Sequence, residues 1–213
     1  MSSQAVNPAN RRSRGFTIVE LLIATLVFSV ILLLVTAGIM QISRVFIKGI
    51  TETNLQNSAR SIVDAIAQNI QFNGGPITET VASPVAGTDY AFCVGNQQFT
   101  YRLGWQVESS PNATKHQAWH GLVQTSAAGC TAQNLANQSV TGRDLIGPHI
   151  RLANLVVTSV GTNQYRVQLR LVYGDDDLLN NPTTTTAACK NILIGTQFCA
   201  QSDLSTIVVK RVK

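Results

Sequence analysis

Apolar and polar positions divide the chain into three parts. Residues 1–15 are polar, contain Pro8, and end in a basic cluster of Arg11, Arg12 and Arg14. Leu21 to Met40 follows as twenty residues without a charged side chain, which is long enough to cross a bilayer as a helix. Beyond Pro76 the sequence changes to short apolar runs separated by polar turns. The pattern therefore predicts a leader, a membrane-spanning helix and a separate globular part.

The helix is expected to continue past the uncharged run. From Gln41 onward apolar residues recur at spacings of three and four and mark a single stripe: Ile42, Val45, Phe46, Ile50, Leu55, Ala59, Ile62, Val63, Ile66 and Ile70. Asn73-Gly74-Gly75-Pro76 would end it. A helix over residues 16–72 would be about 85 Å long, which no compact domain of this size contains. Its first half is therefore expected in lipid or among other subunits, and its second half on the globular part.

The remaining sequence predicts antiparallel strands. Between residues 164 and 173 apolar side chains alternate with Gln and Arg, as in a strand that is half buried against a core. The run over 150–160 reaches this strand through Gly161-Thr162-Asn163, a short hairpin turn. Further strands are expected over 90–94, 98–107, 121–125 and 205–212, with a polar loop over 174–188. The expected fold class is α+β: a long N-terminal helix, transmembrane over about 16–40, packed on an antiparallel β-rich domain over 73–213.

Charge argues against a nucleic-acid partner. The formal net charge is +5, but three of the 16 basic residues are the arginines before the helix, and without them 13 basic residues face 11 acidic ones. Bulk charge thus indicates no nucleic-acid-binding face. The arginines favour a cytoplasmic N-terminus with the globular domain outside, a preference that Arg44 and Lys48 on the far side weaken.

Four cysteines lie beyond the apolar run, and none is in a C-x-x-C pair: Cys93, Cys130, Cys189 and Cys199. Zinc-ribbon and thioredoxin-like sites are therefore disfavoured. Two disulfides on the oxidising side of a membrane explain the cysteines better, and four buried free thiols are the alternative. Three connectivities are possible. The pairs Cys93–Cys130 and Cys189–Cys199 are favoured because each joins neighbours along the chain.

The segment Gly15-Phe16-Thr17-Ile18-Val19-Glu20-Leu21-Leu22 resembles the prepilin processing site of type IV pilins and type II secretion pseudopilins. The resemblance is strong over residues 11–40 and architectural beyond them. It implies the pilin fold, cleavage between Gly15 and Phe16 by prepilin peptidase, and N-methylation of Phe16. Glu20 matches the acid that pairs with the N-terminal amine of a neighbouring subunit during assembly. The implied partners are the peptidase, other pilin or pseudopilin subunits and the inner membrane, from which the subunit enters a pilus or pseudopilus.

The resemblance suggests a particular type of subunit, and several alternative functions compete with it. The helix lacks the proline often found in its middle, and the distal part has two candidate disulfides, which together suggest a minor subunit of the J or W type. A tip adhesin or DNA-uptake pilin of the same architecture is the first alternative, and a membrane-anchored enzyme is a remote one. A secretory signal cut near Ala37 is disfavoured, as is a Glu20 that only snorkels to the interface. Pilus, type II secretion and competence machines all remain open.

No constellation for catalysis or for a cofactor is evident, so the chain is not expected to be an enzyme. His116 and His120 are four residues apart, as two metal ligands on a helix would be, but no third ligand is near them. Asp175, Asp176 and Asp177 offer oxygen atoms, yet they lack the spacing of a calcium loop and follow Gly174 as a solvated turn would. Asn112 and Asn137 begin N-glycosylation sequons, and no G-x-S-x-G motif is present.

Overall fold

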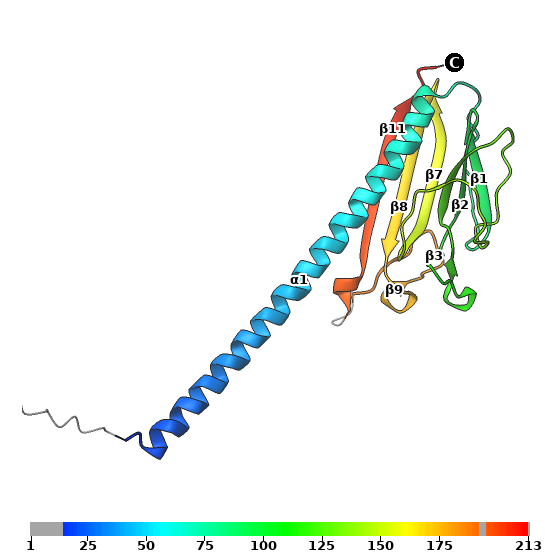
Figure 1. Ribbon diagram of the computed structural model, residues 1–213. Coiled ribbons are helices and arrows are strands. Elements are labelled where there is room, and N and C mark those ends of the chain that lie inside the picture. The colour runs from blue at the N-terminus through cyan, green and yellow to red at the C-terminus, as the bar shows by residue number, and fades with distance from the viewer. Residues whose placement is uncertain (1–14, 192–194, 213) are drawn as a thin grey trace, which may run out of the picture. The chain divides into compact units, whose positions relative to one another are not determined.

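The computed structural model describes residues 15–191 and 195–212 (Figure 1). The chain divides into two compact units, Met1–Ser43 and Arg44–Lys213. The first unit holds the beginning of helix α1, and the second holds its end together with the strands. Of the predicted leader, only Gly15 lies within the described residues.

Helix α1 runs from Ile18 to Phe72 as one continuous α-helix. Its predicted apolar stripe is buried from Leu55 onward, at Leu55, Ala59, Ile62, Val63, Ile66 and Ile70, whereas the stripe over 42–50 is exposed. Full burial of one such leucine or isoleucine stabilises the fold by about 1.5–3 kcal/mol. The helix ends where Asn73 Nδ2 donates to Asn69 Oδ1 (2.6 Å), shortly before Gly75 turns with φ of 97°.

The strands form two main sheets and a short ribbon. The four-stranded sheet has the order β1 (Asp89–Val94), β2 (Gln97–Arg102), β5 (Leu122–Ser126), β6 (Arg143–Asp144). The five-stranded sheet has the order β11 (Ala200–Val209), β8 (Gln164–Tyr173), β7 (Ile150–Gly161), β3 (Gln106–Val107), β4 (Gln117–Ala118). The ribbon pairs β9 (Leu179–Asn180) with β10 (Ala188–Cys189). Among the described strands, all pairs are antiparallel except β3 with β4.

The hydrophobic core joins the end of α1 to both sheets. The helix contributes the stripe that begins at Leu55, the four-stranded sheet contributes Phe92 and Phe99, and the β7–β8 hairpin contributes Leu155 and Leu169. Phe92 and Phe99 stack across β1 and β2 with ring centroids 4.8 Å apart. A smaller cluster on the other face of the five-stranded sheet packs Val172 against Leu179 and Ala187. This architecture confirms the α+β fold class and is consistent with the pilin fold.

The prediction of one strand over residues 98–107 is wrong. Gly104 has a φ of 75° and ends the strand character, so β2 and β3 are separate and belong to different sheets. A Cβ at this position would lie 2.9 Å from the Cβ of Ala86 and 3.0 Å from the Thr183 backbone. The sharp turn and the close approach both require glycine here. The chain therefore passes from the four-stranded sheet to the five-stranded sheet at this point.

Two tyrosines that face each other across β1 and β2 differ in their hydroxyl partners. Tyr90 OH accepts a hydrogen bond from the Val85 backbone N–H at 2.9 Å. Tyr101 is fully buried, and its hydroxyl has no hydrogen-bond partner of acceptable geometry among the described residues. Burial raises the pKa of Tyr101 above its ordinary value, an effect that the Val81 backbone opposes.

The substitution Tyr101→Phe is therefore expected to leave the free energy of unfolding unchanged or to raise it. An unpaired buried hydroxyl costs about 1–3 kcal/mol, and phenylalanine keeps the ring while removing that group. The matched control, Tyr90→Phe, loses a hydrogen bond and should lower the free energy of unfolding by about 0.5–1.5 kcal/mol. Denaturant unfolding of both variants measures the difference. A loss at Tyr101 as large as that at Tyr90 would show that the Tyr101 hydroxyl is paired in solution.

Candidate functional site

The N-terminal site consists of Gly15, Phe16 and the first turn of α1. Gly15 and Phe16 precede the helix, and both are exposed. Phe16 exposes 78% of its surface and Ile18 exposes 80%. The bond between Gly15 and Phe16 thus lies in exposed chain just before the helix. Residues 1–14, which would complete a leader, lie outside the described residues.

Thr17 and Glu20 cap the helix reciprocally. A carboxylate oxygen of Glu20 accepts hydrogen bonds from the Thr17 backbone N–H (3.0 Å) and hydroxyl (2.8 Å), while the Glu20 N–H donates to Thr17 Oγ1 (3.2 Å). This is the arrangement of a capping box, in which Thr and Glu are three residues apart. The sequence analysis missed the cap, although Thr17-x-x-Glu20 was visible in the motif. In the single chain the carboxylate therefore lies at the start of the helix, beside Phe16.

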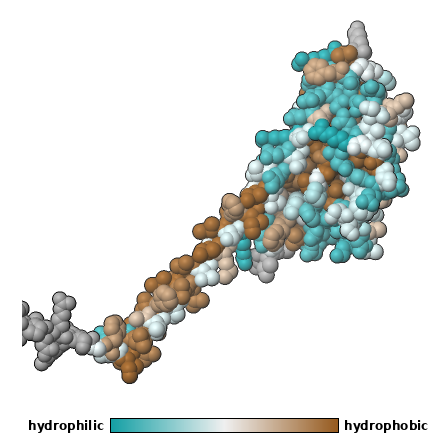
Figure 2. All heavy atoms as spheres, viewed as in Figure 1, coloured by the Kyte–Doolittle hydropathy of each residue, from teal (hydrophilic) through white to brown (hydrophobic). Residues whose placement is uncertain are grey.

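The first part of α1 has an apolar surface, and Figure 2 shows mostly hydrophobic residues along the face of the helix in view. Every large apolar side chain from Phe16 to Ile50 exposes between 38% and 80% of its surface. The hydroxyls within it bond to their own helix: Thr25 to Leu22 O, Ser29 to Leu26 O and Thr36 to Leu32 O. Within the described residues α1 is the one helix long and apolar enough to cross a membrane. Exposed apolar surface on this scale marks contact with lipid or protein.

Both disulfides lie in the second unit. Cys93 is joined to Cys130 and Cys189 to Cys199, which are the pairs that the sequence favoured. The first bridge ties the last part of β1 to the long loop between β5 and β6. The second joins cysteines ten positions apart, next to the start of β11. Both bridges therefore hold connecting segments to the sheets.

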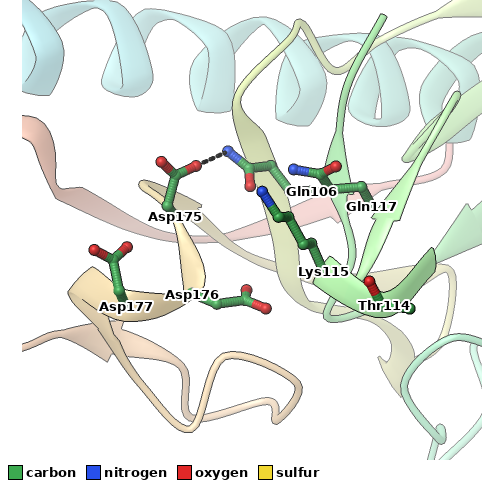
Figure 3. A pocket seen from close by; sticks show the side chains of 7 residues that line it. All are labelled: Gln106, Thr114, Lys115, Gln117, Asp175, Asp176 and Asp177. Carbon is green, nitrogen blue, oxygen red and sulfur yellow. Dashed lines mark hydrogen bonds between the residues drawn. The ribbon is translucent and has the colours of Figure 1, made fainter. Parts of the chain in front are cut away.

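The aspartate triplet lines a polar hollow of about 450 Å³ with Gln106, Thr114, Lys115 and Gln117 (Figure 3). Asp175 accepts a hydrogen bond from Gln106 Nε2 at 3.1 Å. Asp176 begins a 3-10 helix, Asp176–Leu178, and the Asp177 carbonyl accepts from Lys190 Nζ. The described residues contain no group of three or more His, Cys, Asp or Glu side chains placed to hold a metal ion. Asp175 and Asp177 are exposed, as expected of a solvated turn, whereas Asp176 is half-buried and ties this corner to the domain.

Arg151 holds this corner in place. It was not predicted from the sequence as a functional or structural site. Arg151 lies in β7 with its side chain fully buried. Its guanidinium forms an ion pair with Asp176 and donates to the carbonyls of Gly104 and Pro182. Burial lowers the pKa of Arg151 from its ordinary value, and the charge of Asp176 opposes that shift. The one sequence signal that could have identified Arg151 is its position among mostly apolar residues in Ile150–Leu155.

The three histidines each face a different carboxylate. His116 Nδ1 lies 2.8 Å from Asp176, His120 Nδ1 lies 2.9 Å from Asp144, and His149 Nδ1 lies 2.7 Å from Glu108. His116 follows a 3-10 helix with a φ of 51°, so it does not share a helix face with His120. Each histidine therefore links its own segment to a carboxylate on another segment, and the three histidines do not share a metal site. Asn112 and Asn137, which begin the two sequons, are exposed in loops.

Comparison with known proteins identifies one segment. Residues 10–36 match the prokaryotic N-terminal methylation motif, which is typical of type IV pilins and pseudopilins. The motif implies processing by prepilin peptidase and assembly with other pilin subunits, and the single apolar helix fits a pilin anchored in the inner membrane. No curated protein and no solved structure matches the chain at a significant level.

Proposed function

We propose that this protein is a pilin or pseudopilin subunit that prepilin peptidase cleaves between Gly15 and Phe16. The observation that carries the proposal is the methylation motif over residues 10–36. The apolar surface of α1 supports it, because a helix exposed on all sides over residues 18–50 needs lipid or other helices around it. The proposed role is structural: the protein would act by associating with other subunits and not by catalysing a reaction.

Assembly would use the charge that cleavage creates. Removal of residues 1–15 leaves an amine on Phe16, which the peptidase then methylates. Glu20 of one subunit would pair with the Phe16 amine of its neighbour, and in a medium of low dielectric constant this attraction is several times stronger than in water. A lone charged Glu in hydrocarbon costs about 2.5–3.5 kcal/mol on insertion scales, which favours the paired state. The pair would set the register of adjacent helices.

The subunit would be a minor one, of the J or W type, with its globular domain outside the cytoplasm. The uninterrupted helix at Ala37 and Gly38 and the two disulfides support this subtype. Disulfides persist in oxidising compartments, which agrees with a periplasmic or extracellular domain and a cytoplasmic leader. The proposed domains are accordingly a leader over 1–15, a helix over 16–72 and a globular domain over 73–213.

The N-terminus of the mature protein tests this proposal. We expect mass spectrometry of the membrane-extracted protein to find N-methyl-Phe16 as the first residue. The variant Gly15→Val should block cleavage, because glycine lets the chain lie extended in a protease site without a side-chain clash. Gly38→Ala serves as the matched control, since a Cβ there would meet nothing within 4 Å. A mature protein that begins at Met1 or near Ala37 would refute the proposal.

A further inference from the structure

Strand β11 is the one long unprotected edge among the described strands. The other three edge strands of the two main sheets are short or covered. The outer side of β7 beyond its one pair with β3, Gln106 with Arg151, is contacted by Thr80 and Glu79. Strands β4 and β6 have two residues each. Strand β1 is covered by the segment after α1, where Ile77 bridges Val94 and the Thr78 N–H donates to the Cys93 carbonyl (2.9 Å). Strand β11 has ten residues and, in the described part of the chain, pairs only with β8.

The hydrogen bonds of β11 show which backbone groups point away from the sheet. The Lys210 N–H donates to the Asn163 carbonyl at 2.8 Å, on the side of β8. Backbone groups along a strand alternate between its two sides. The N–H and C=O groups of Ser205, Ile207 and Val209 therefore point outward, where no described strand pairs with them. A row of unpaired groups of this kind is a template for another strand.

The sequence of β11 lacks the devices that normally protect an edge. Natural edges carry prolines, bulges or free charges that prevent pairing. All ten residues of β11 pair with β8 in one register without a bulge, and the strand contains neither Pro nor Gly. Its one charged residue, Asp203, forms an ion pair with Arg170 of its own sheet. Ile207 and Val209 are instead 57% and 51% exposed beside the outward backbone groups.

Helix α1 packs on one face of β11 and leaves the opposite face exposed. Leu204 and Val208 belong to the core that includes the α1 stripe. Ile207 and Val209 alternate with them and so lie on the opposite face of the sheet. The loop that covers the smaller cluster lies near β10, which contacts the end of β11 that is farther from Val209. The segment from Ser205 to Val209 thus combines an open edge with exposed β-branched side chains.

We propose that the edge of β11 binds an extended segment of another polypeptide by strand addition. The backbone groups determine this class of partner, because a helix already uses its own N–H and C=O groups and a lipid chain has none. Exposed Ile207 and Val209 favour apolar side chains at alternate positions of the partner. Lys210 and Arg211, which follow the strand, contact the end of α1: Lys210 Nζ donates to the Gly75 carbonyl, and the Arg211 N–H donates to the Gln71 carbonyl while its guanidinium lies over the Phe72 ring. The surface open to a partner strand therefore ends at Val209. This surface is separate from the helix that the proposed function uses for assembly.

A peptide copied from the strand itself is a suitable probe. The sequence of residues 203–211 is extended in the structure over 203–209, and in an antiparallel register centred on Ile207 its Asp203 lies opposite Arg211. Fluorescence anisotropy would follow the labelled peptide as full-length protein in detergent micelles is added. The control peptide carries an N-methyl group on each amide from Leu204 to Val209, which removes the donors on both of its edges and retains the side chains. Saturable binding of the unmodified peptide alone is expected, with slower amide exchange at Ser205, Ile207 and Val209.

Variants of the protein locate the binding surface. Ile207→Lys should weaken peptide binding by at least about tenfold, because a free lysine protects an edge from pairing. Ile207→Pro should do the same without a charge, and it removes only an outward N–H, as edge strands tolerate. Val160→Lys, at an exposed bulged position of β7 that β8 separates from β11, should change affinity less than twofold, or about 0.4 kcal/mol. Equal binding of the methylated peptide, no saturable binding, or equal losses at Ile207 and Val160 would each overturn the proposal.

Discussion

Glu20→Gln is expected to leave the protein processed and inserted in the membrane but missing from filaments. Glutamine keeps the reach of the side chain and still accepts the Thr17 hydrogen bonds of the capping box, so the first turn of α1 survives. What the variant removes is the negative charge that would pair with the Phe16 amine of a neighbour. A charge left alone in a buried pair costs about 3–5 kcal/mol, which corresponds to roughly a hundredfold to several thousandfold loss in association.

The control for this experiment is Thr17→Ala, which removes the cap and retains the charge. Loss of a cap costs about 0.5–2 kcal/mol of helix stability and leaves the proposed ion pair available. Fractionation measures both variants, because under the proposed function processed protein would be found either in the inner membrane or in sheared filaments. Glu20→Gln should accumulate in the membrane, whereas Thr17→Ala should still reach the filament. Entry of Glu20→Gln into filaments at the wild-type level would show that this charge does not direct assembly.

Local patterns along the chain were enough to predict the elements that depend on neighbouring residues. The helix follows from apolar residues at spacings of three and four, and α1 extends to Phe72 as the glycines and Pro76 indicate. The β7–β8 hairpin follows from strict alternation and a short turn, and the structure closes it through Thr162 and Asn163. In both cases the residues that determine the element lie within a few positions of each other.

Features that depend on distant residues could not be predicted in this way. The change of sheet at Gly104 requires its backbone to approach Thr183, which is nearly eighty positions away in the chain. Arg151 is placed by the carbonyl group of Gly104 and by Asp176 and the Pro182 carbonyl, which belong to two segments distant from β7 in the chain. The free edge of β11 depends on the order of all five strands in its sheet. No local period records such contacts, because each forms only when the whole domain is packed.

The cap formed by Thr17 and Glu20 is a different case. Its sequence pattern was visible, but Glu20 also matched the assembly residue of the family motif. Glu20 was assigned to a neighbouring subunit on the strength of the family motif. In the single chain its carboxylate is occupied by Thr17, three residues away. The two roles are compatible, since a carboxylate accepts several hydrogen bonds and the cap places it at the helix start. In the proposed assembly, the cap would therefore hold the carboxylate at the helix start, where the amine of a neighbouring subunit would pair with it.

Asp176→Asn is expected to be the most damaging single substitution in the globular domain outside the apolar core. It keeps the shape of the side chain but leaves the fully buried guanidinium of Arg151 without its counter-ion. Breaking a buried pair in this way typically costs about 3–5 kcal/mol, and the partial exposure of Asp176 favours the lower end of that range. For a domain of this size a loss of about 3 kcal/mol lowers the melting temperature by about 6–12 °C.

Two comparisons show whether the effect comes from the buried charge. Asp203→Asn breaks the Arg170–Asp203 pair at the surface, where both side chains are exposed by 33% or more, and should cost no more than about 1 kcal/mol. Asp176→Asn should also cost much less in an Arg151→Met background, because methionine leaves no buried charge to neutralise. Thermal and denaturant unfolding of the four proteins in this cycle measure the coupling energy between Arg151 and Asp176. A coupling near zero would mean that Asp176 orders its corner through His116 and the backbone, with the guanidinium satisfied by the two carbonyls alone.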